Sequence, residues 1–197
     1  MLVSWSMKKL LGIVVLGLLL SLNAKADNIR DFQVEGMSLE DSALDYFSEK
    51  EIKKYTLKYK YNNNDFVPVG PKINLKAYDS LQFYYKNNDD KKPIHVISGI
   101  IWFENNIEAC FKEKKSVIEE LKLIFPGTKQ IDMGIQKHTF DKTGKSTKSN
   151  YRFVFSNGDY AYVACYDWSK KLKFKDHLRV GVVKKDFDYW IHNVASK

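Results

Sequence analysis

The sequence is poor in the patterns that mark metal and redox sites. It has two cysteines and four histidines, and it contains neither Cys-x-x-Cys nor His-x-x-x-His. These absences remove the common spacings of zinc sites and of thioredoxin-like exchange. The asparagine and aspartate clusters at 62–65 and 87–90 lack the bidentate glutamate of an EF-hand loop and are typical of turns. We therefore predict no metal site and no cofactor.

Phosphate-binding and hydrolase signatures are also absent. The ten glycines form no glycine-rich phosphate loop at a strand-to-helix junction, and Gly-x-Ser-x-Gly does not occur. The one lysine-rich candidate, "KTGKST", lies between two expected strands and is typical of a polar hairpin loop. The sequence thus gives no support to a kinase, a nucleotide-dependent oxidoreductase or a hydrolase with a nucleophile elbow.

Long hydrophobic runs are absent except at the N-terminus. Residues 10–22 are almost unbroken in apolar character, Lys8 and Lys9 precede them, and "AKA" at 24–26 places small residues where signal peptidase reads. The run is shorter than the roughly 20 residues that a membrane-spanning helix needs. We therefore predict a secretory signal peptide over residues 1–26 and no stable membrane anchor in the mature form.

We expect cleavage between Ala26 and Asp27, which leaves residues 27–197 as one domain, periplasmic or secreted. Either Met1 or Met7 can start the signal, because "MKKLLGIVVLGLLLSLNAKA" is complete by itself. The removed segment holds three lysines and no acid, so the formal net charge falls from +8 to +5 (8 − 3). This modest charge does not indicate nucleic acid, and any attraction to a membrane surface would weaken with salt.

The two cysteines, Cys110 and Cys165, both lie in the mature part. In an oxidising compartment two cysteines most simply form one disulfide. Cys110 is near the start of an amphipathic helix, and Cys165 shares a strand face with Ala161 and Val163, so a helix packed on a sheet brings the two together. Closing a loop of 55 residues (165 − 110) stabilises a fold by about 4 kcal/mol in the chain-entropy model.

Periodicity and turn residues predict an α+β fold, a largely antiparallel sheet with helices on one face, stapled by one disulfide. Ser38 with Asp41 and Ser48 with Glu51 resemble capping boxes for helices at about 39–47 and 49–55. Two more helices are expected within "NNIEACFKEKKSVIEELKLIFPG" and "KKDFDYWIHNVA". The expected strands include "YTLKYKY", "IHVISGIIWF" as a covered central strand, "NYRFVF", "YAYVACYDW" after an Asn-Gly hairpin turn, and "LRVGVV".

Aromatic residues are abundant, and they provide the candidate binding residues. Tyr160, Tyr162 and Tyr166 fall on one face of a strand, opposite Cys165. A second aromatic row, Tyr151, Phe153 and Phe155, lies on the hairpin partner, with Arg152 and the lysines of 170–175 nearby. Such rows stack on sugars, bases or peptide side chains. The alternative is that cross-strand aromatic pairs only stabilise the sheet.

The stretches "IRDFQVEGMSLEDSALDYFSEKEIKKY" and "CYDWSKK…DHLRV" resemble a family of small exported proteins of marine bacteria. This resemblance covers nearly the whole mature chain and implies export and this order of elements, but it carries over no functional residue. The helix start "EGMSLED" is also similar to that of small outer-membrane assembly lipoproteins. The chain departs from them because it has no lipid-acceptor cysteine and a longer sheet region.

The leading hypothesis is a non-catalytic periplasmic domain that binds a small ligand or an unknown envelope protein. An alternative is a secreted or periplasmic hydrolase whose site is assembled from distant residues such as Cys165, Asp167 and His177. A third is a structural protein of the envelope. The first hypothesis follows from export, one disulfide and the absence of a catalytic motif.

Overall fold

The computed structural model describes residues 29–195. The expected signal peptide, its cleavage site after Ala26 and both start methionines lie outside the described residues. Within 29–195, no helix is long and apolar enough to cross a bilayer.

The strands are β1 (Phe66–Val69), β2 (Ser80–Lys86), β3 (Ile94–Trp102), β4 (Lys129–Lys137), β5 (Thr147–Val154), β6 (Tyr160–Asp167) and β7 (His177–Val183). The helices are α2 (Glu49–Tyr55), α3 (Ile107–Ile124) and α4 (Lys185–Asn193), with 3-10 turns at Ile29–Asp31, Ala43–Asp45 and Lys170–Leu172.

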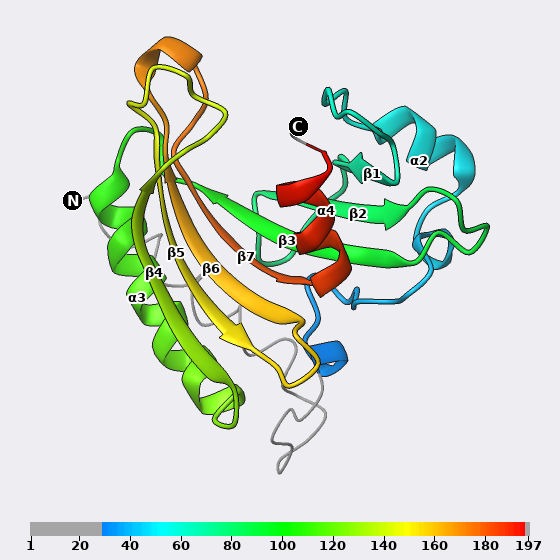
Figure 1. Ribbon diagram of the computed structural model, residues 1–197, viewed down its shortest axis with the longest axis horizontal. Helices are drawn as coiled ribbons and strands as arrows, with labels where there is room; N and C mark the ends of the chain where they lie inside the picture. The colour runs from blue at the N-terminus through cyan, green and yellow to red at the C-terminus, as the bar shows by residue number, and fades with distance from the viewer. Residues whose placement is uncertain (1–28, 196–197) are drawn as a thin grey trace.

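All seven strands form one antiparallel sheet in the order β1-β2-β3-β7-β6-β5-β4 (Figure 1). After β3 the chain passes through α3 and re-enters at the far edge with β4. The last four strands then return as a meander until β7 pairs with β3. Residues 94–100 of β3 are buried, which confirms the prediction of a covered interior strand.

Helices α2 and α3 begin at capping residues, and the β5–β6 turn forms at an Asn-Gly pair, as the local sequence predicts. The Ser48 hydroxyl accepts from the Glu51 amide, and the Glu51 carboxylate accepts from the Ser48 amide, so the predicted capping box opens α2. Asn106 caps α3 by accepting from the Ala109 amide at 3.1 Å. Gly158 has a φ of 90°, the left-handed conformation that the Asn-Gly turn between β5 and β6 requires.

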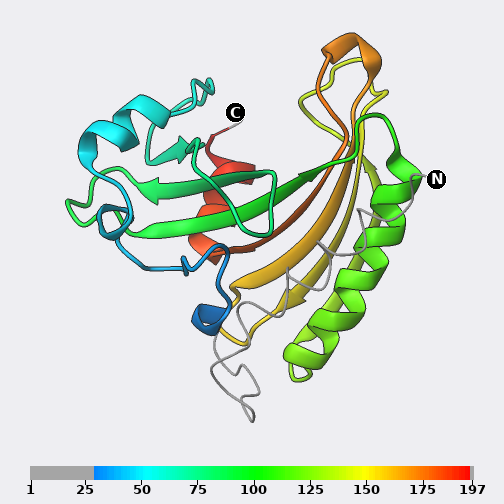
Figure 2. The same cartoon turned by 180° about the vertical axis from the view of Figure 1, so that it is seen from behind.

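The face of the sheet that bears Ala161, Val163 and Cys165, called here the helix face, holds the main hydrophobic core. Helix α3 packs on it, as seen from behind in Figure 2. Cys110 of α3 and Cys165 of β6 form a disulfide, and both side chains are fully buried. The α+β class, the antiparallel sheet and the disulfide are thereby confirmed.

Helix α4 packs on the opposite face, which bears Tyr160, Tyr162 and Tyr166 and is called here the tyrosine face. It lies in front of the sheet in Figure 1 and behind it in Figure 2. Phe187 and Trp190 of α4 join a second apolar cluster with the tyrosines. The helices therefore do not all share one face, because the apolar side of α4 finds aromatic rings on the face that α3 leaves uncovered.

Residues 39–47 do not form the expected helix. Glu40 has a φ of 69°, which interrupts a right-handed helix, and only Ala43–Asp45 form a 3-10 turn. The Asp41 carboxylate accepts from the Ser38 amide at 2.8 Å, and it also accepts from the Tyr46 hydroxyl. The capping-like spacing thus closes a turn rather than starting a helix.

Residues 55–61 do not form the expected strand either. Thr56 makes an isolated bridge with Val69, and the Leu57 amide donates to the Pro68 carbonyl at 2.9 Å. The segment therefore runs extended beside β1 without a continuous ladder. Strand β1 itself was not predicted, because Pro68 marks a break in sequence, yet an edge strand tolerates proline.

The sheet bends where β3 pairs with β7, so that β1–β3 and β4–β7 run in different directions (Figure 1). Two glycines lie at this junction, Gly99 and Gly181. A Cβ at Gly181 would lie 2.3 Å from the Ile97 carbonyl oxygen, and one at Gly99 would overlap the Tyr78 ring. Both close approaches require glycine, and the resulting bend makes the tyrosine face concave.

Candidate functional site

The tyrosine face carries polar side chains that the strand register brings into neighbouring rows. Lys148 lies opposite Tyr166, Arg152 opposite Tyr162, and Arg179 opposite Ala164. We call the part of this face beyond α4 the basic hollow. Its residues are Gln82, Ser98, Lys148, Asn150, Arg152, Tyr162, Tyr166, His177 and Arg179.

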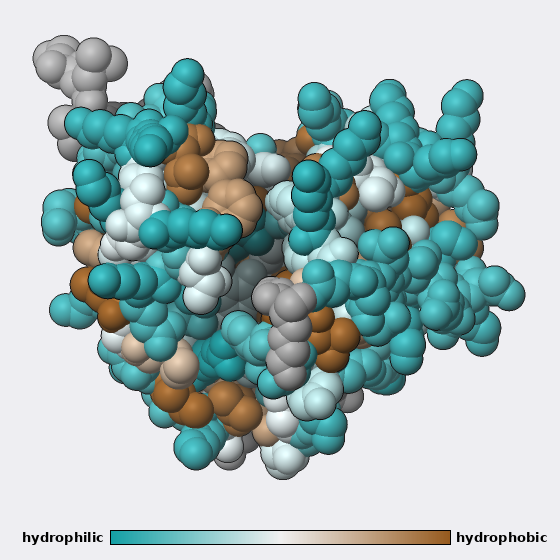
Figure 3. Space-filling model, turned by 45° about the horizontal axis from the view of Figure 1, so that its top comes forward, coloured by the Kyte–Doolittle hydropathy of each residue, from teal (hydrophilic) through white to brown (hydrophobic). Residues whose placement is uncertain are grey.

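The molecule has a depression in its surface near the bend of the sheet. Figure 3 shows a deep recess between the two halves of the molecule, with hydrophilic colouring at its centre. The middle rows of the tyrosine face contain its two smallest residues, Ala164 and Gly181.

Three cations crowd this concave face. Arg179 has its Nε donating to His177 Nε2 at 3.2 Å, and its guanidinium lies 5.4 Å from the centre of the Tyr166 ring. Arg152 lies 4.2 Å over the Tyr160 ring. Lys148 is the third cation, and it is half-buried. Aromatic faces attract these cations without neutralising them.

Among the described residues, Asp188 of α4 is the one carboxylate paired with any of these cations. Its Oδ1 lies 3.4 Å from Arg152 Nη2 and accepts from the Tyr160 hydroxyl at 2.5 Å. Neither Lys148 nor Arg179 forms an ion pair within residues 29–195. The hollow therefore keeps an excess of positive charge.

The pKa values of Lys148 and His138 are both lowered at this face. Burial lowers the pKa of Lys148, and the neighbouring Arg152 lowers it further. Burial also lowers the pKa of His138 at the rim, where Lys148 and Arg179 add to the effect. Each shift disfavours additional positive charge, and an anion in the hollow would oppose it.

His177 is a neutral member of the site. Burial, reinforced by Arg179, lowers its pKa to about 3. Its Nδ1 lies 2.9 Å from the Lys175 carbonyl, and as a donor there it leaves Nε2 free to accept from Arg179. His177 thus orients the Arg179 guanidinium toward the hollow without adding charge.

Two polar atoms of the face, Asn150 Oδ1 and Arg152 Nε, have no hydrogen-bond partner within residues 29–195. Asn150 is buried and lies in the same row as Ala164 and Arg179. Buried polar groups are nearly always hydrogen-bonded, so Asn150 Oδ1 can accept, and Arg152 Nε can donate, one further bond to water or to another molecule.

Aromatic rings form one wall of the hollow. Tyr166 stacks on His177 with ring centres 4.7 Å apart, and Trp168 continues the stack at 6.1 Å from Tyr166. On the opposite side Gln82 donates to the Tyr59 hydroxyl at 3.2 Å. The arrangement combines flat apolar faces with cationic groups, which suits a ligand that has both a ring and a negative charge.

The predicted platform is only partly present. Tyr160, Tyr162 and Tyr166 do share a face with Arg152, as expected. The second aromatic row lies on the other face, since Tyr151 pairs with Val163 and Phe153 pairs with Ala161 in the helix face. The two rows therefore do not form one surface, and Tyr160 is covered by α4.

The residues of the hydrolase alternative are not brought together. Cys165 is disulfide-bonded, and Asp167 shares its side of β6, whereas His177 lies opposite Tyr166 on the tyrosine face. No group of three or more histidine, cysteine, aspartate or glutamate side chains gathers to hold a metal in the part of the chain that the structure describes.

Sequence reasoning missed Arg179 and Lys148. A signal for the first was present, because Arg179 is the one charged residue in "LRVGVV". Lys148, Asn150 and Arg152 alternate along β5 and so predict a polar strand face. The pairing of these strands decides that the three cations meet, and that pairing is not local in sequence.

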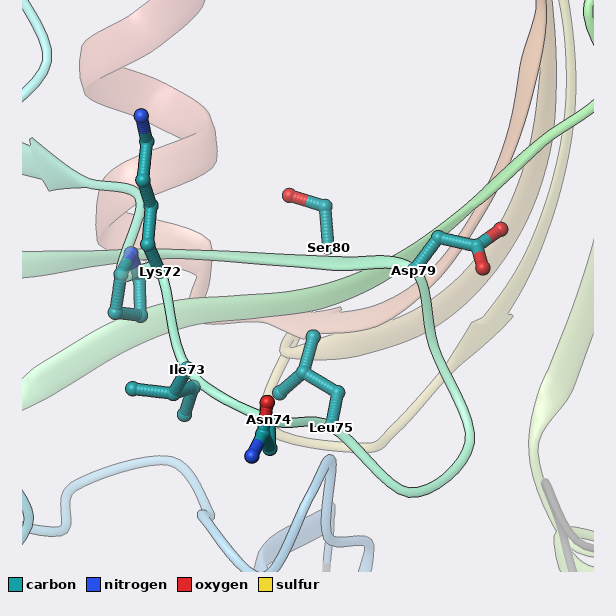
Figure 4. Close-up of a pocket in the computed structure, with 7 residues that line it drawn as sticks. Lys72, Ile73, Asn74, Leu75, Asp79 and Ser80 are labelled. Atoms are coloured by element: carbon teal, nitrogen blue, oxygen red, sulfur yellow. The ribbon is translucent and has the colours of Figure 1, made fainter.

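Two cavities lie elsewhere. One of about 490 Å³ lies beneath the loop 71–75, where the Lys72 ammonium and the Asp79 carboxylate point away from one another (Figure 4). The other, of about 390 Å³, lies between α3 and the edge strand β4, where the buried Lys114 donates to Ser149 at 2.6 Å. Neither cavity is lined by the cations of the tyrosine face.

No protein-family model, curated protein or solved structure matches the chain, so its geometry carries the functional argument.

Proposed function

We propose that the chain is an exported, non-catalytic binding domain that takes a small organic anion in the basic hollow. The observation that carries this proposal is the crowding of Lys148, Arg152 and Arg179 on one concave face with a single paired carboxylate, Asp188. A cluster of like charges is unfavourable in the free protein, and a bound carboxylate, sulfate or phosphate group neutralises it.

The ligand's charged group is expected at Arg179 and Lys148, and its flat body against the Tyr166–Trp168 wall. Arginine matches oxyanions with its fork of donors, and aromatic faces stack on sugar or aromatic rings. Both features require an anionic ligand that contains a ring, such as an acidic sugar or an aromatic carboxylate. This class agrees with a binding role rather than with a reaction.

Export is part of the proposal. The N-terminal lysine pair, apolar run and "AKA" site support it, and so does the Cys110–Cys165 disulfide, because such bonds persist in oxidising compartments. The intact mass of protein recovered from the periplasm tests this. A chain that starts at Asp27 is expected, and a chain that still starts at Met1 or Met7 would contradict it.

Binding is tested by calorimetry with matched ligand pairs that differ in charge, glucuronate against glucose and benzoate against benzamide. The anion of at least one pair is expected to bind, and its neutral partner to bind more weakly by about tenfold or more. Arg179→Met should abolish this preference, while Lys72→Met at the separate cavity should leave it unchanged. Equal binding within both pairs, or an unaffected Arg179→Met variant, would contradict the proposal.

A further inference from the structure

The end of the sheet next to the hollow carries a second surface of different character. It consists of the β4–β5 loop, residues 138–146, and the β6–β7 loop, residues 168–176, and we call it the loop tip. The two loops project together beyond the strand ends at the upper left of Figure 1. The Ser169 amide donates to Ser146 Oγ at 2.9 Å, which ties one loop to the other.

The loop tip is strongly basic. It holds six lysines and two aspartates, a formal charge of +4 (6 − 2), while the whole chain from residue 27 carries +5. All six lysines are exposed, whereas Asp141 and Asp176 are both buried. The lysines are Lys142, Lys145, Lys170, Lys171, Lys173 and Lys175. Glu104, at the adjoining end of β3, pairs with Lys175 at 2.6 Å, so five of the six lysines present unpaired positive charge at this end of the described residues.

Two phenylalanines stand among these lysines. Phe140 is 64 % exposed and Phe174 is 49 % exposed, one on each loop, and their ring centres lie 6.2 Å apart. In Figure 3, where this end is turned forward, hydrophobic side chains reach the surface among hydrophilic ones. A paired apolar surface ringed by cations is not explained by the core, because neither ring is buried in it.

The loops hold this arrangement in place. Asp141 accepts hydrogen bonds from the amides and hydroxyls of both Thr143 and Ser146, at 2.7 to 3.0 Å. Asp176 accepts from the Trp168 amide at 2.8 Å, and Trp168 contacts Phe174 at a ring distance of 5.0 Å. The buried acids thus organise the backbone and leave the lysines and phenylalanines outward.

We propose that the loop tip docks on an anionic membrane surface, with the lysines at the lipid headgroups and the two phenylalanines inserted at the interface. Charge complementarity supports this occupant, because exposed lysines are attracted to anionic lipids. The exposed phenylalanine pair supports a lipid phase over an acidic protein, since rings inserted between headgroups leave water without needing a matched pocket. The attachment is peripheral and involves no spanning segment.

Co-sedimentation tests this with the chain that begins at Asp27, because the apolar run at 10–22 would itself enter a bilayer. The probes are vesicles of phosphatidylcholine alone and vesicles of equal parts phosphatidylcholine and phosphatidylglycerol. Binding is expected to the anionic vesicles only, and it should weaken as salt shortens the screening length to about 10 Å at roughly 0.1 M. Equal binding to both vesicles, or to neither, would overturn the proposal.

The apolar part is tested by Phe140→Ser with Phe174→Ser. Affinity for the anionic vesicles should fall at least about tenfold, because both inserted rings are lost. The matched control is Leu123→Ser with Tyr189→Ser, which removes two exposed apolar side chains outside the loop tip. Equal binding by the two double variants would contradict insertion, and circular dichroism verifies that both remain folded.

The charged part is tested by four lysine-to-glutamine changes. When the four changes are made in the loop tip, vesicle affinity should fall by up to about fivefold for each lysine that contacts the vesicle surface. The tip set is Lys142, Lys145, Lys171 and Lys173, and the control set is the exposed Lys50, Lys53, Lys58 and Lys60. Equal losses in the two sets would overturn the assignment of the tip.

The loop tip and the proposed ligand site share Trp168 at their border, but they are tested by different variants. Arg179→Met is expected to retain full vesicle binding, because Arg179 lies in the sheet and not in either loop. If instead the loop-tip variants lose capture of an acidic protein while no vesicle binding is seen, the tip is a protein-docking surface and the membrane proposal fails.

Discussion

Leu178 and Arg179 are neighbours in β7, yet they lie in opposite environments. Leu178 is fully buried on the helix face, in the core that α3 covers. Arg179 lies on the tyrosine face, where it contacts His177 and Tyr166 and forms no ion pair with a described carboxylate. The helix face of the sheet therefore stabilises the fold, whereas the tyrosine face holds cations that repel one another.

The two faces differ in how much they contribute to stability. The helix face buries apolar area and holds the disulfide, which together stabilise the fold. The tyrosine face is apolar beneath α4 and polar beyond it. Under the proposed anion-binding role, the well-packed helix face offsets the cost of the uncompensated cations on the tyrosine face.

The largest expected effect comes from the helix face. Replacing both cysteines, Cys110→Ala with Cys165→Ala, should lower the free energy of unfolding by about 4 kcal/mol, because the cross-link closes a loop of 55 residues. Urea denaturation under non-reducing conditions measures it. Anion binding by the folded fraction should persist, and its loss would show that the two faces are not separate.

The next comparison uses the two neighbours in β7. Leu178→Ala should destabilise the protein by about 3 kcal/mol, because it leaves a cavity in the core. Arg179→Met should change stability by less than about 1 kcal/mol, or raise it, since it removes one of three crowded cations. Urea midpoints of the two variants measure this. A large loss in Arg179→Met would mean that Arg179 is structural.

The third prediction concerns pH and His177. Its folded pKa of about 3 lies below the usual value of 6.5, so the folded state favours the neutral ring. The stability that the neutral ring contributes is fully present above about pH 6.5, and it is lost as pH falls from there toward about 3. At about pH 5 the loss amounts to roughly 2 kcal/mol of unfolding free energy.

The variant His177→Gln tests that contribution, because glutamine does not titrate and retains a donor and an acceptor. The difference in unfolding free energy between neutral and mildly acidic pH should shrink relative to the unchanged protein. An identical pH dependence in the two proteins would show that His177 is not the group responsible.

The smallest effect is expected at Asp188. Asp188→Asn removes the carboxylate paired with Arg152 but keeps an acceptor for the Tyr160 hydroxyl. Anion affinity should rise a few-fold, and stability should fall by less than about 1 kcal/mol, because the pair is partly exposed. Calorimetry with the same anion measures the first. Asp45→Asn, outside the tyrosine face, is the charge-matched control and should leave affinity unchanged.

Much of the fold was predictable because its signals are local. The cap of α3 at Asn106, the capping box of α2 and the Asn-Gly turn before β6 each involve a few consecutive residues. The predictions failed at 39–47 and 55–61, where Glu40 in a left-handed conformation and contacts with β1 override local propensity.

The candidate site was less predictable. Alternation correctly placed Tyr160, Tyr162 and Tyr166 on one face, and the structure shows that the opposite face holds the main core. It did not reveal that Arg179 faces the same space as Lys148, since 31 residues (179 − 148) separate them in the chain. Only the register across β5, β6 and β7 brings them together.

The sequence by itself determined the α+β class, the disulfide partners and the two-sided character of β6, because periodicity and the count of cysteines are properties of the chain. The tertiary structure decided that the sheet bends at Gly99 and Gly181, that α4 covers part of the tyrosine face, and that three cations share the remainder. These features depend on which distant strands pair and how closely they approach, and no short stretch of sequence encodes either.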